Sequence, residues 1–191
     1  MPGQRGGRPG TLISLIASFL CLAVLLCTGL AFGSTILSVI ESGGDEQPAL
    51  ARTGQPAPDF VLNNIAGQAI RLSDFNGHPR LINFWTTWCG PCREEMPILQ
   101  DRYSRWAPRL VIIGVDECEK PIDALSYVTE YLLTFPMLID EACKIGPKDY
   151  LVRAYPTSFF VDETGIIRSV IIGGMTPRIL DDNLRLIGVG Y

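Results

Sequence analysis

The apolar residues of this chain gather into short runs that are separated by polar turns. Runs of this length, rich in Val, Ile and Phe, are typical of buried strands. The runs that predict strands are 80–85, 110–115, 135–139, 158–162 and 166–172. The last two flank Glu163-Thr164-Gly165 and predict a hairpin. Earlier in the chain, residues 57–74 carry short apolar segments broken by Asn63-Asn64 and Gly67, which predicts an N-terminal β-hairpin.

Between these runs, apolar positions recur every three or four residues, which is the spacing of one helix face. This periodicity predicts helices at 91–106, 121–134 and 176–187, and a short helix at 146–154. Strands that alternate with helices form a sheet with parallel crossovers. The pattern therefore predicts an α/β domain over residues 54–191 that ends in a hairpin and a helix.

Residues 11–40 contain no charged side chain and consist mainly of Leu, Ile, Val, Ala and Phe. This run exceeds the roughly 20 apolar residues that a membrane-spanning helix needs. Arg5 and Arg8 precede the run and acidic residues follow it, so the positive-inside rule places residues 1–10 in the cytoplasm. We therefore expect a single-pass transmembrane anchor in the cell membrane, with an extracytoplasmic domain behind it.

Two alternatives for this segment stay open. Ala31-Phe32-Gly33 resembles a signal-peptide cleavage site. Cys21 and Cys27 are candidates for lipid attachment, although the Leu that precedes each of them argues against it. The apolar run continues to Ile40, which favours a retained anchor. Residues 41–53 are rich in Gly, Pro and charge, which indicates a linker between the anchor and the domain.

Net charge and cysteine usage limit the class of function. The net charge is −4 and the basic residues are scattered, so we expect no nucleic-acid partner. Two of the six cysteines form Cys89-Gly90-Pro91-Cys92. A C-x-x-C pair is half of a zinc site, but the chain has no second such pair and a single histidine. We therefore expect no metal and no cofactor.

The cysteine pair lies where strand 80–85 gives way to helix 91–106. Pro91 suits the first helical turn because its missing N–H costs nothing there. The free N–H groups of a helix N-terminus favour a thiolate over a thiol. This placement indicates that Cys89 is the nucleophile and that Cys92 resolves the mixed disulfide. Trp88 offers a flat apolar surface for a docked peptide.

Trp-Cys-Gly-Pro-Cys at residues 88–92 is the active-site motif of thioredoxin-like proteins. The wider pattern resembles the membrane-anchored TlpA/ResA/CcmG-like thiol-disulfide oxidoreductases of the redoxin/AhpC-TSA branch. The likeness covers about residues 54–174, and is carried by Gly54-Gln55-Pro56-Ala57-Pro58-Asp59-Phe60, Asn83-Phe84-Trp85 and Glu95-Met96-Pro97. It implies a thioredoxin fold with an N-terminal β-hairpin and a central helix–strand insertion, preceded by one transmembrane helix.

The resemblance also implies a substrate-binding surface. It places Pro156 in a cis-proline loop opposite the cysteines, where neighbouring backbone groups can pair with an extended substrate. The residues assigned to this surface are Trp88, Gly90, Pro91, Tyr155, Pro156 and Thr157.

A third candidate catalytic residue, besides the two cysteines, follows from the same resemblance. Thioredoxins bury an aspartate where Asn83 stands here, whereas ResA-like members carry a glutamate at the position of Glu95. A partly buried carboxylate there would exchange a proton with Cys92, so Glu95 is a candidate catalytic residue. The alternative is a solvated helix residue near the positive helix end.

Cys118 and Cys143 follow strands that are predicted to end at Val115 and Ile139. If these strands are parallel neighbours, both cysteines emerge at one sheet edge, and an oxidising compartment favours their disulfide. We expect a structural bridge that stabilises the domain by about 3 kcal/mol. The alternative is a second redox pair that relays electrons to Cys89 and Cys92.

Together these features predict an extracytoplasmic thiol-disulfide oxidoreductase that reduces disulfides in protein substrates. The resemblance implies a membrane thiol-electron donor of the CcdA or DsbD type, and suggests apocytochrome c in cytochrome c maturation as a client. One alternative is a peroxiredoxin-like thiol peroxidase, for which Thr86 fits but Asn83 stands where that family has proline. The other is a non-catalytic docking module.

Overall fold

The computed structural model describes residues 51–190 of the chain. The predicted tail and anchor, and all but three residues of the predicted linker, lie outside this part. Among residues 51–190, no helix combines the length and the apolar character that a membrane span needs.

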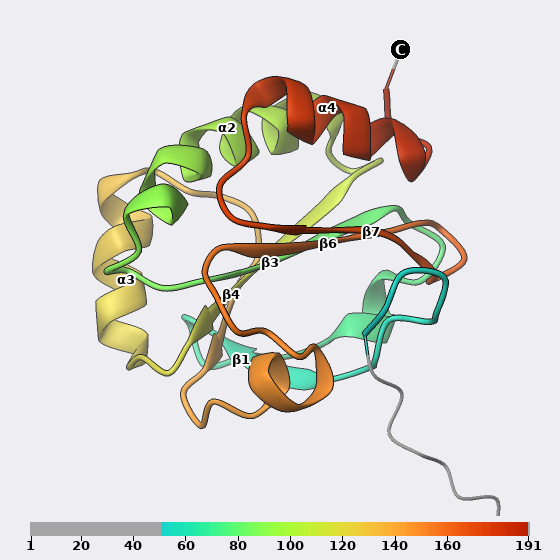
Figure 1. Ribbon diagram of the computed structural model, residues 1–191. Coiled ribbons are helices and arrows are strands. Elements are labelled where there is room, and N and C mark those ends of the chain that lie inside the picture. The colour runs from blue at the N-terminus through green and yellow to red at the C-terminus, as the bar shows by residue number, and fades with distance from the viewer. Residues whose placement is uncertain (1–50, 191) are drawn as a thin grey trace, which may run out of the picture. The chain divides into compact units, whose positions relative to one another are not determined.

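A seven-stranded mixed sheet lies at the centre of the described domain (Figure 1). Its strand order is β2-β1-β5-β4-β3-β6-β7. The neighbours β3, β4 and β5 are parallel, and the other adjacent pairs are antiparallel. The strands are β1 (Val61–Asn64), β2 (Ala69–Arg71), β3 (Arg80–Trp85), β4 (Val111–Glu117), β5 (Met137–Asp140), β6 (Thr157–Val161) and β7 (Ile167–Ile172).

Helices α2 (Gly90–Trp106), α3 (Pro121–Glu130) and α4 (Pro177–Leu186) pack on one face of this sheet (Figure 1). The opposite face is covered by the 3-10 helix η1 (Leu72–Phe75) and the π-helical turn η2 (Ile145–Asp149). Every residue of β3 is buried. A strand covered on both faces is expected to be largely apolar, which explains why apolar and polar residues do not alternate along β3.

The predicted elements around the cysteine pair are confirmed. Strand β3 has the predicted bounds, and α2 begins one residue before the predicted start. Cys89 is the N-cap residue of α2, and Pro97 lies inside the helix. The N-terminal hairpin is present as β1 and β2, and α3 with β5 forms the expected helix–strand unit between β4 and β6.

Three predicted elements end two or more residues away from their predicted ends. Strand β4 continues to Glu117, because its two acidic residues stay in the ladder beside Trp85 and Asp140. Helix α3 ends at Glu130, and Leu132 takes a left-handed φ of 53° that a helix cannot continue through. The predicted helix 146–154 is only the short turn η2, since Leu151 has a φ of 55°.

Replacement of Leu99 by Ala tests the core between α2 and the sheet. Leu99 is fully buried, so the variant loses apolar contacts and leaves a cavity. We expect the free energy of unfolding to fall by about 2–5 kcal/mol in chemical denaturation. Ile122→Ala is the control, because Ile122 is 61% exposed, and it should change stability by no more than about 0.5 kcal/mol. Equal losses in the two variants would contradict this description of the core.

Candidate active site

A disulfide joins Cys89 and Cys92 across the first turn of α2, with their Cα atoms 5.3 Å apart. The backbone N–H of Cys92 donates a hydrogen bond to Cys89 Sγ over 3.2 Å. Cys92 is fully buried, whereas Cys89 is 5% exposed and lies between exposed Trp88 and Gly90. An incoming sulfur atom therefore reaches Cys89 before Cys92, which is the order that their predicted roles require.

Trp88 and Tyr155 form an aromatic wall beside the cysteine pair. Their ring centroids are 5.9 Å apart in an edge-on arrangement, and Trp88 is 70% exposed. The Tyr155–Pro156 peptide bond is cis, as expected. Pro156 and Thr157 are buried, so their side chains are closed to a protein substrate, whereas those of Trp88 and Tyr155 are open to it.

Exposed residues at the start of α2 complete this surface. Gly90 and Pro91 are both exposed. Pro91 packs closely against Gly174, since a Cβ atom at Gly174 would lie 3.3 Å from Pro91 Cβ. The segment before α4 thus contacts the turn that holds the cysteines.

Glu95 is 1% exposed, so the solvated alternative is wrong. Its Oε1 accepts a hydrogen bond of 2.7 Å from Asn83 Nδ2, and its Oε2 accepts one of 3.0 Å from the Met175 N–H. Burial raises the pKa of Glu95 to about 7, although both hydrogen bonds oppose the shift. Glu95 follows Cys92 by three residues, so the two side chains lie on the same side of α2.

Asn83 completes this buried network. Its Nδ2 also donates to Ser158 Oγ over 2.9 Å, so both amide hydrogens are used. An asparagine holds no proton that it could give up at physiological pH. Glu95 is therefore the group in this network that can bind and release a proton. Sequence reasoning placed Asn83 correctly but missed Ser158, whose only signal was a hydroxyl on the strand next to β3.

A second network lies at the C-terminal end of β4, and sequence reasoning missed it. Glu119 accepts hydrogen bonds from the Thr87 N–H (2.5 Å) and hydroxyl (2.6 Å), just before Trp88 and Cys89. Glu117 accepts from the Tyr155 hydroxyl (3.2 Å) on the other side. The available signal was the group of acidic residues Asp116, Glu117 and Glu119 at the end of this strand, which does not indicate their partners.

Burial also changes the acidity of this network. It raises the pKa of Asp116 to about 9, with neighbouring Glu119 adding to the shift, and that of Glu117 to about 8, with Asp140 adding to it. These two carboxyl groups therefore hold their protons at neutral pH and place little negative charge beneath the site.

Cys118 and Cys143 are joined by a disulfide. Strands β4 and β5 are parallel neighbours, so the two cysteines emerge at the same sheet edge, as the sequence indicated. Both residues are exposed. Among residues 51–190, no group of three or more His, Cys, Asp and Glu is arranged to hold a metal ion.

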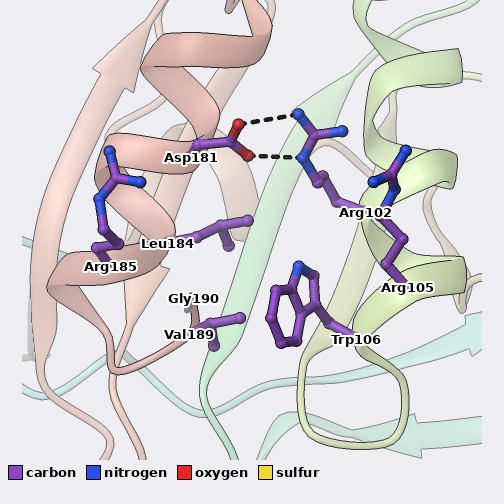
Figure 2. A pocket seen from close by; sticks show the side chains of 8 residues that line it. All are labelled: Arg102, Arg105, Trp106, Asp181, Leu184, Arg185, Val189 and Gly190. Carbon is purple, nitrogen blue, oxygen red and sulfur yellow. Dashed lines mark hydrogen bonds and ion pairs between the residues drawn. The ribbon is translucent and has the colours of Figure 1, made fainter.

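A pocket between α2 and α4 does not belong to this site (Figure 2). It lies at the C-terminal half of α2, away from Cys92. Arg102 binds Asp181 with two hydrogen bonds of 2.6 and 2.9 Å, as Figure 2 shows. The other lining arginines, Arg105 and Arg185, pair with Asp101 and Asp182. Each of the three lining arginines therefore already pairs with a carboxylate.

Comparison with known proteins places the chain in a family. The sequence model of the AhpC/TSA family matches residues 53–170. The chain belongs to the AhpC/TSA family. It is 39% identical over 138 residues to the thioredoxin-like protein YneN of Bacillus subtilis, covering 70% of this chain and 79% of YneN. It is 35% identical over 166 residues to the thiol-disulfide oxidoreductase ResA of Geobacillus kaustophilus, covering 86% and 92%.

Solved structures agree with this AhpC/TSA assignment. A thiol:disulfide interchange protein of the thioredoxin family from Chlorobium tepidum superposes with a TM-score of 0.62 at 27% identity, covering 73% of this chain and 99% of that one. StoA from Bacillus subtilis superposes with a TM-score of 0.56 at 28% identity, covering 66% and 96%. The fold is therefore thioredoxin-like, as predicted.

The pH dependence of stability tests the buried state of Glu95. The folded pKa of about 7 exceeds the ordinary value of 4.5, so the folded state holds this proton more tightly than the unfolded chain. The resulting stabilisation is complete below pH 4.5 and is lost as pH rises through about 7. Relative to Glu95→Gln, the wild type should therefore lose up to about 3 kcal/mol of unfolding free energy between pH 4.5 and 8.

Chemical denaturation at several pH values measures this difference. Glu94→Gln is the matched control, because Glu94 precedes Glu95 in the chain but is exposed. A wild-type pH slope that matches that of Glu95→Gln would show that Glu95 does not titrate in this range.

Proposed function

We propose that this protein is a thiol-disulfide oxidoreductase that reduces disulfides in protein substrates outside the cytoplasm. The observation that carries the proposal is the cysteine pair itself, at the N-terminus of α2 with buried Glu95 on the same side of the helix. The name of the ResA relative, a thiol-disulfide oxidoreductase, supports the reaction class.

The reaction begins with the reduced pair. The Cys89 thiolate attacks one sulfur of the substrate disulfide, forming a mixed disulfide while the other substrate sulfur leaves as a thiolate. Cys92 then attacks Cys89 Sγ, releases the second substrate sulfur and closes the Cys89–Cys92 disulfide. Two electrons pass from the enzyme dithiol to the substrate, and two protons follow them.

Glu95 serves the second step of this sequence. Cys92 is fully buried and must lose its proton before it attacks, but water does not reach it. A carboxyl group with a pKa of about 7 is divided between its two protonation states at neutral pH, so Glu95 can accept that proton. The same group returns a proton when the disulfide is reduced again.

The substrate lies along the aromatic wall of Trp88 and Tyr155. Trp88 is 70% exposed and next to the nucleophile, so a peptide that covers it buries a large apolar area. The exposed backbone around Gly90 and Pro91 lies within reach of the same peptide.

The extracytoplasmic location rests on residues 11–40 and on the second disulfide. The uncharged run preceded by Arg5 and Arg8 supports an anchor with the domain outside the cytoplasm. Disulfides such as Cys118–Cys143 persist mainly in oxidising compartments. An enzyme that gives up two electrons there needs a donor, and we extend the proposal to a membrane dithiol carrier of the CcdA or DsbD type. Apocytochrome c is the proposed client, from the family resemblance.

A thiol peroxidase is the second candidate, because the chain belongs to the AhpC/TSA family. The site favours the exchange reaction. Asn83 is fully buried and bound to Glu95 where peroxidases carry proline, and the partner of Cys89 is only three residues away. Peroxide consumption no faster than that of a Cys89→Ser/Cys92→Ser variant would exclude the peroxidase. The same double variant excludes a docking module if it fails to complement loss of the gene.

Trapping tests the assigned order of the two cysteines. Cys92→Ser lacks the resolving thiol, so Cys89 should stay joined to its partners and covalent complexes should accumulate on non-reducing gels. Mass spectrometry should place the bond at Cys89. Cys89→Ser and the double variant are the controls and should trap little. Trapping through Cys92 instead would reverse the proposed roles.

Exchange kinetics test the role of Glu95. In Glu95→Gln the Cys92 thiol loses its proton acceptor, so disulfide reduction at pH 7 should slow by about tenfold or more. The wild-type rate should also show a pH step near 7 that this variant lacks, and the Cys thiol titrations should shift. Glu94→Gln should retain both the rate and the step. Unchanged thiol titration in Glu95→Gln would remove Glu95 from the mechanism.

A further inference from the structure

The Cys118–Cys143 disulfide differs from the active-site pair in its surroundings. Both of its residues are exposed, whereas Cys89 and Cys92 are buried. Both also have left-handed backbone angles, with φ of 65° and 53°. Residues other than glycine rarely adopt this conformation because the side chain crowds the backbone. Both residues of this disulfide are thus accessible to a reductant, and both have an unfavourable backbone conformation.

Exposed or strained disulfides are the labile ones in proteins, whereas buried relaxed ones resist reduction. We propose that Cys118–Cys143 is a second redox-active disulfide, which a dithiol reduces in the folded protein, and that its reduction loosens the loop that carries Cys89. This departs from the purely structural bridge that the sequence favoured, and the exposure of both cysteines is the reason.

The step balances as ordinary thiol–disulfide exchange. A thiolate of the donor dithiol attacks the sulfur of Cys118 or Cys143, and the other cysteine leaves as a thiolate. The second donor thiol then displaces the attacked cysteine and closes the donor disulfide. Two electrons and two protons pass from the dithiol to the pair.

Hydrogen bonds hold this part of the fold without the disulfide. The N–H groups of Cys118 and Cys143 both donate to the Asp140 carbonyl oxygen, over 3.0 and 2.9 Å. The Asp140 carboxylate accepts from the N–H groups of Lys144 and Ile145 over 3.1 and 2.6 Å. These contacts remain when the S–S bond opens, so reduction does not require unfolding.

The coupling to the active site runs through the neighbours of Cys118. Glu119 accepts both hydrogen bonds of Thr87, which lies two residues before Cys89. Glu117 accepts from the Tyr155 hydroxyl. Once the disulfide opens, the Cys118 side chain is no longer tied to Cys143, so hydrogen bonds alone hold the segment that carries Glu117 and Glu119, and that segment is less tightly fixed. Because Trp88 contacts Tyr155, both sides of the proposed substrate surface depend on this segment.

Reduction of the full-length Cys89→Ser/Cys92→Ser variant tests the redox pair without the active-site thiols. The variant is titrated with dithiothreitol, free thiols are alkylated, and mass spectrometry locates the label. We expect Cys118 and Cys143 to become labelled while the near-UV circular dichroism of the fold is retained. Labelling only where that signal is lost, or none at all, would overturn the proposal and leave a structural bridge.

Amide hydrogen exchange at Thr87, in the same variant, tests the coupling. Loss of the Glu119 hydrogen bond should speed exchange of this amide by about three- to tenfold after reduction, the range that one hydrogen bond gives. Glu119→Ala removes the acceptor and gives the reference rate, while the amides of β3 serve as the internal control. An unchanged Thr87 rate in the reduced protein would overturn the coupling.

The effect on substrate binding rests on the proposed function. For disulfide reduction, Cys118→Ser/Cys143→Ser should raise KM by about three- to tenfold with kcat changed less than about twofold, because binding is affected and not bond exchange. An unchanged KM would contradict the link to the substrate surface. If the wild type reduces no disulfide, the proposed function fails, whereas the labelling and the exchange at Thr87 still decide the redox pair and its coupling.

Discussion

Glu95 accepts two hydrogen bonds at a place on α2 that is almost closed to water. The donors come from β3 and from the segment before α4, so the sheet, the helix and the C-terminal part must all pack before this environment exists. Hydrogen bonds favour the ionised carboxyl, and burial disfavours it more strongly. The pKa of the Glu95 carboxyl is therefore set by the packing of the whole domain. Cys92 lies one helical turn before Glu95 on α2.

The parallel pairing of β3 and β4 brings Glu119 to the loop that carries Cys89. In this register Trp85 lies opposite Asp116, so the residues after each strand leave the sheet side by side. Thr87 and Glu119 meet for that reason, although 32 residues separate them in sequence. Because the cysteine loop is held by Glu119, which follows β4, the active site and the second disulfide share one edge of the sheet.

Local sequence was sufficient to predict an element where the residues themselves favour one conformation. The apolar run of β3, the proline at the start of α2 and the spacing of the cysteines predicted their structures almost to the residue. Long-range burial was harder to predict. Asp116 and Glu117 suggested the end of a strand because carboxyl groups are rarely buried, yet both remain in the ladder of β4. The partners of Glu119 and Glu117 come from distant segments, and no local pattern indicates them.

The buried carboxyl groups couple folding to proton binding, because the folded protein holds protons that the unfolded chain releases. Glu95, Glu117 and Asp116 have pKa values of about 7, 8 and 9, and all three would ionise in an extended chain at neutral pH. Denaturation at pH 7 therefore releases protons from these groups to the medium. The calorimetric heat of that transition therefore includes the protonation enthalpy of the buffer, which takes up the released protons.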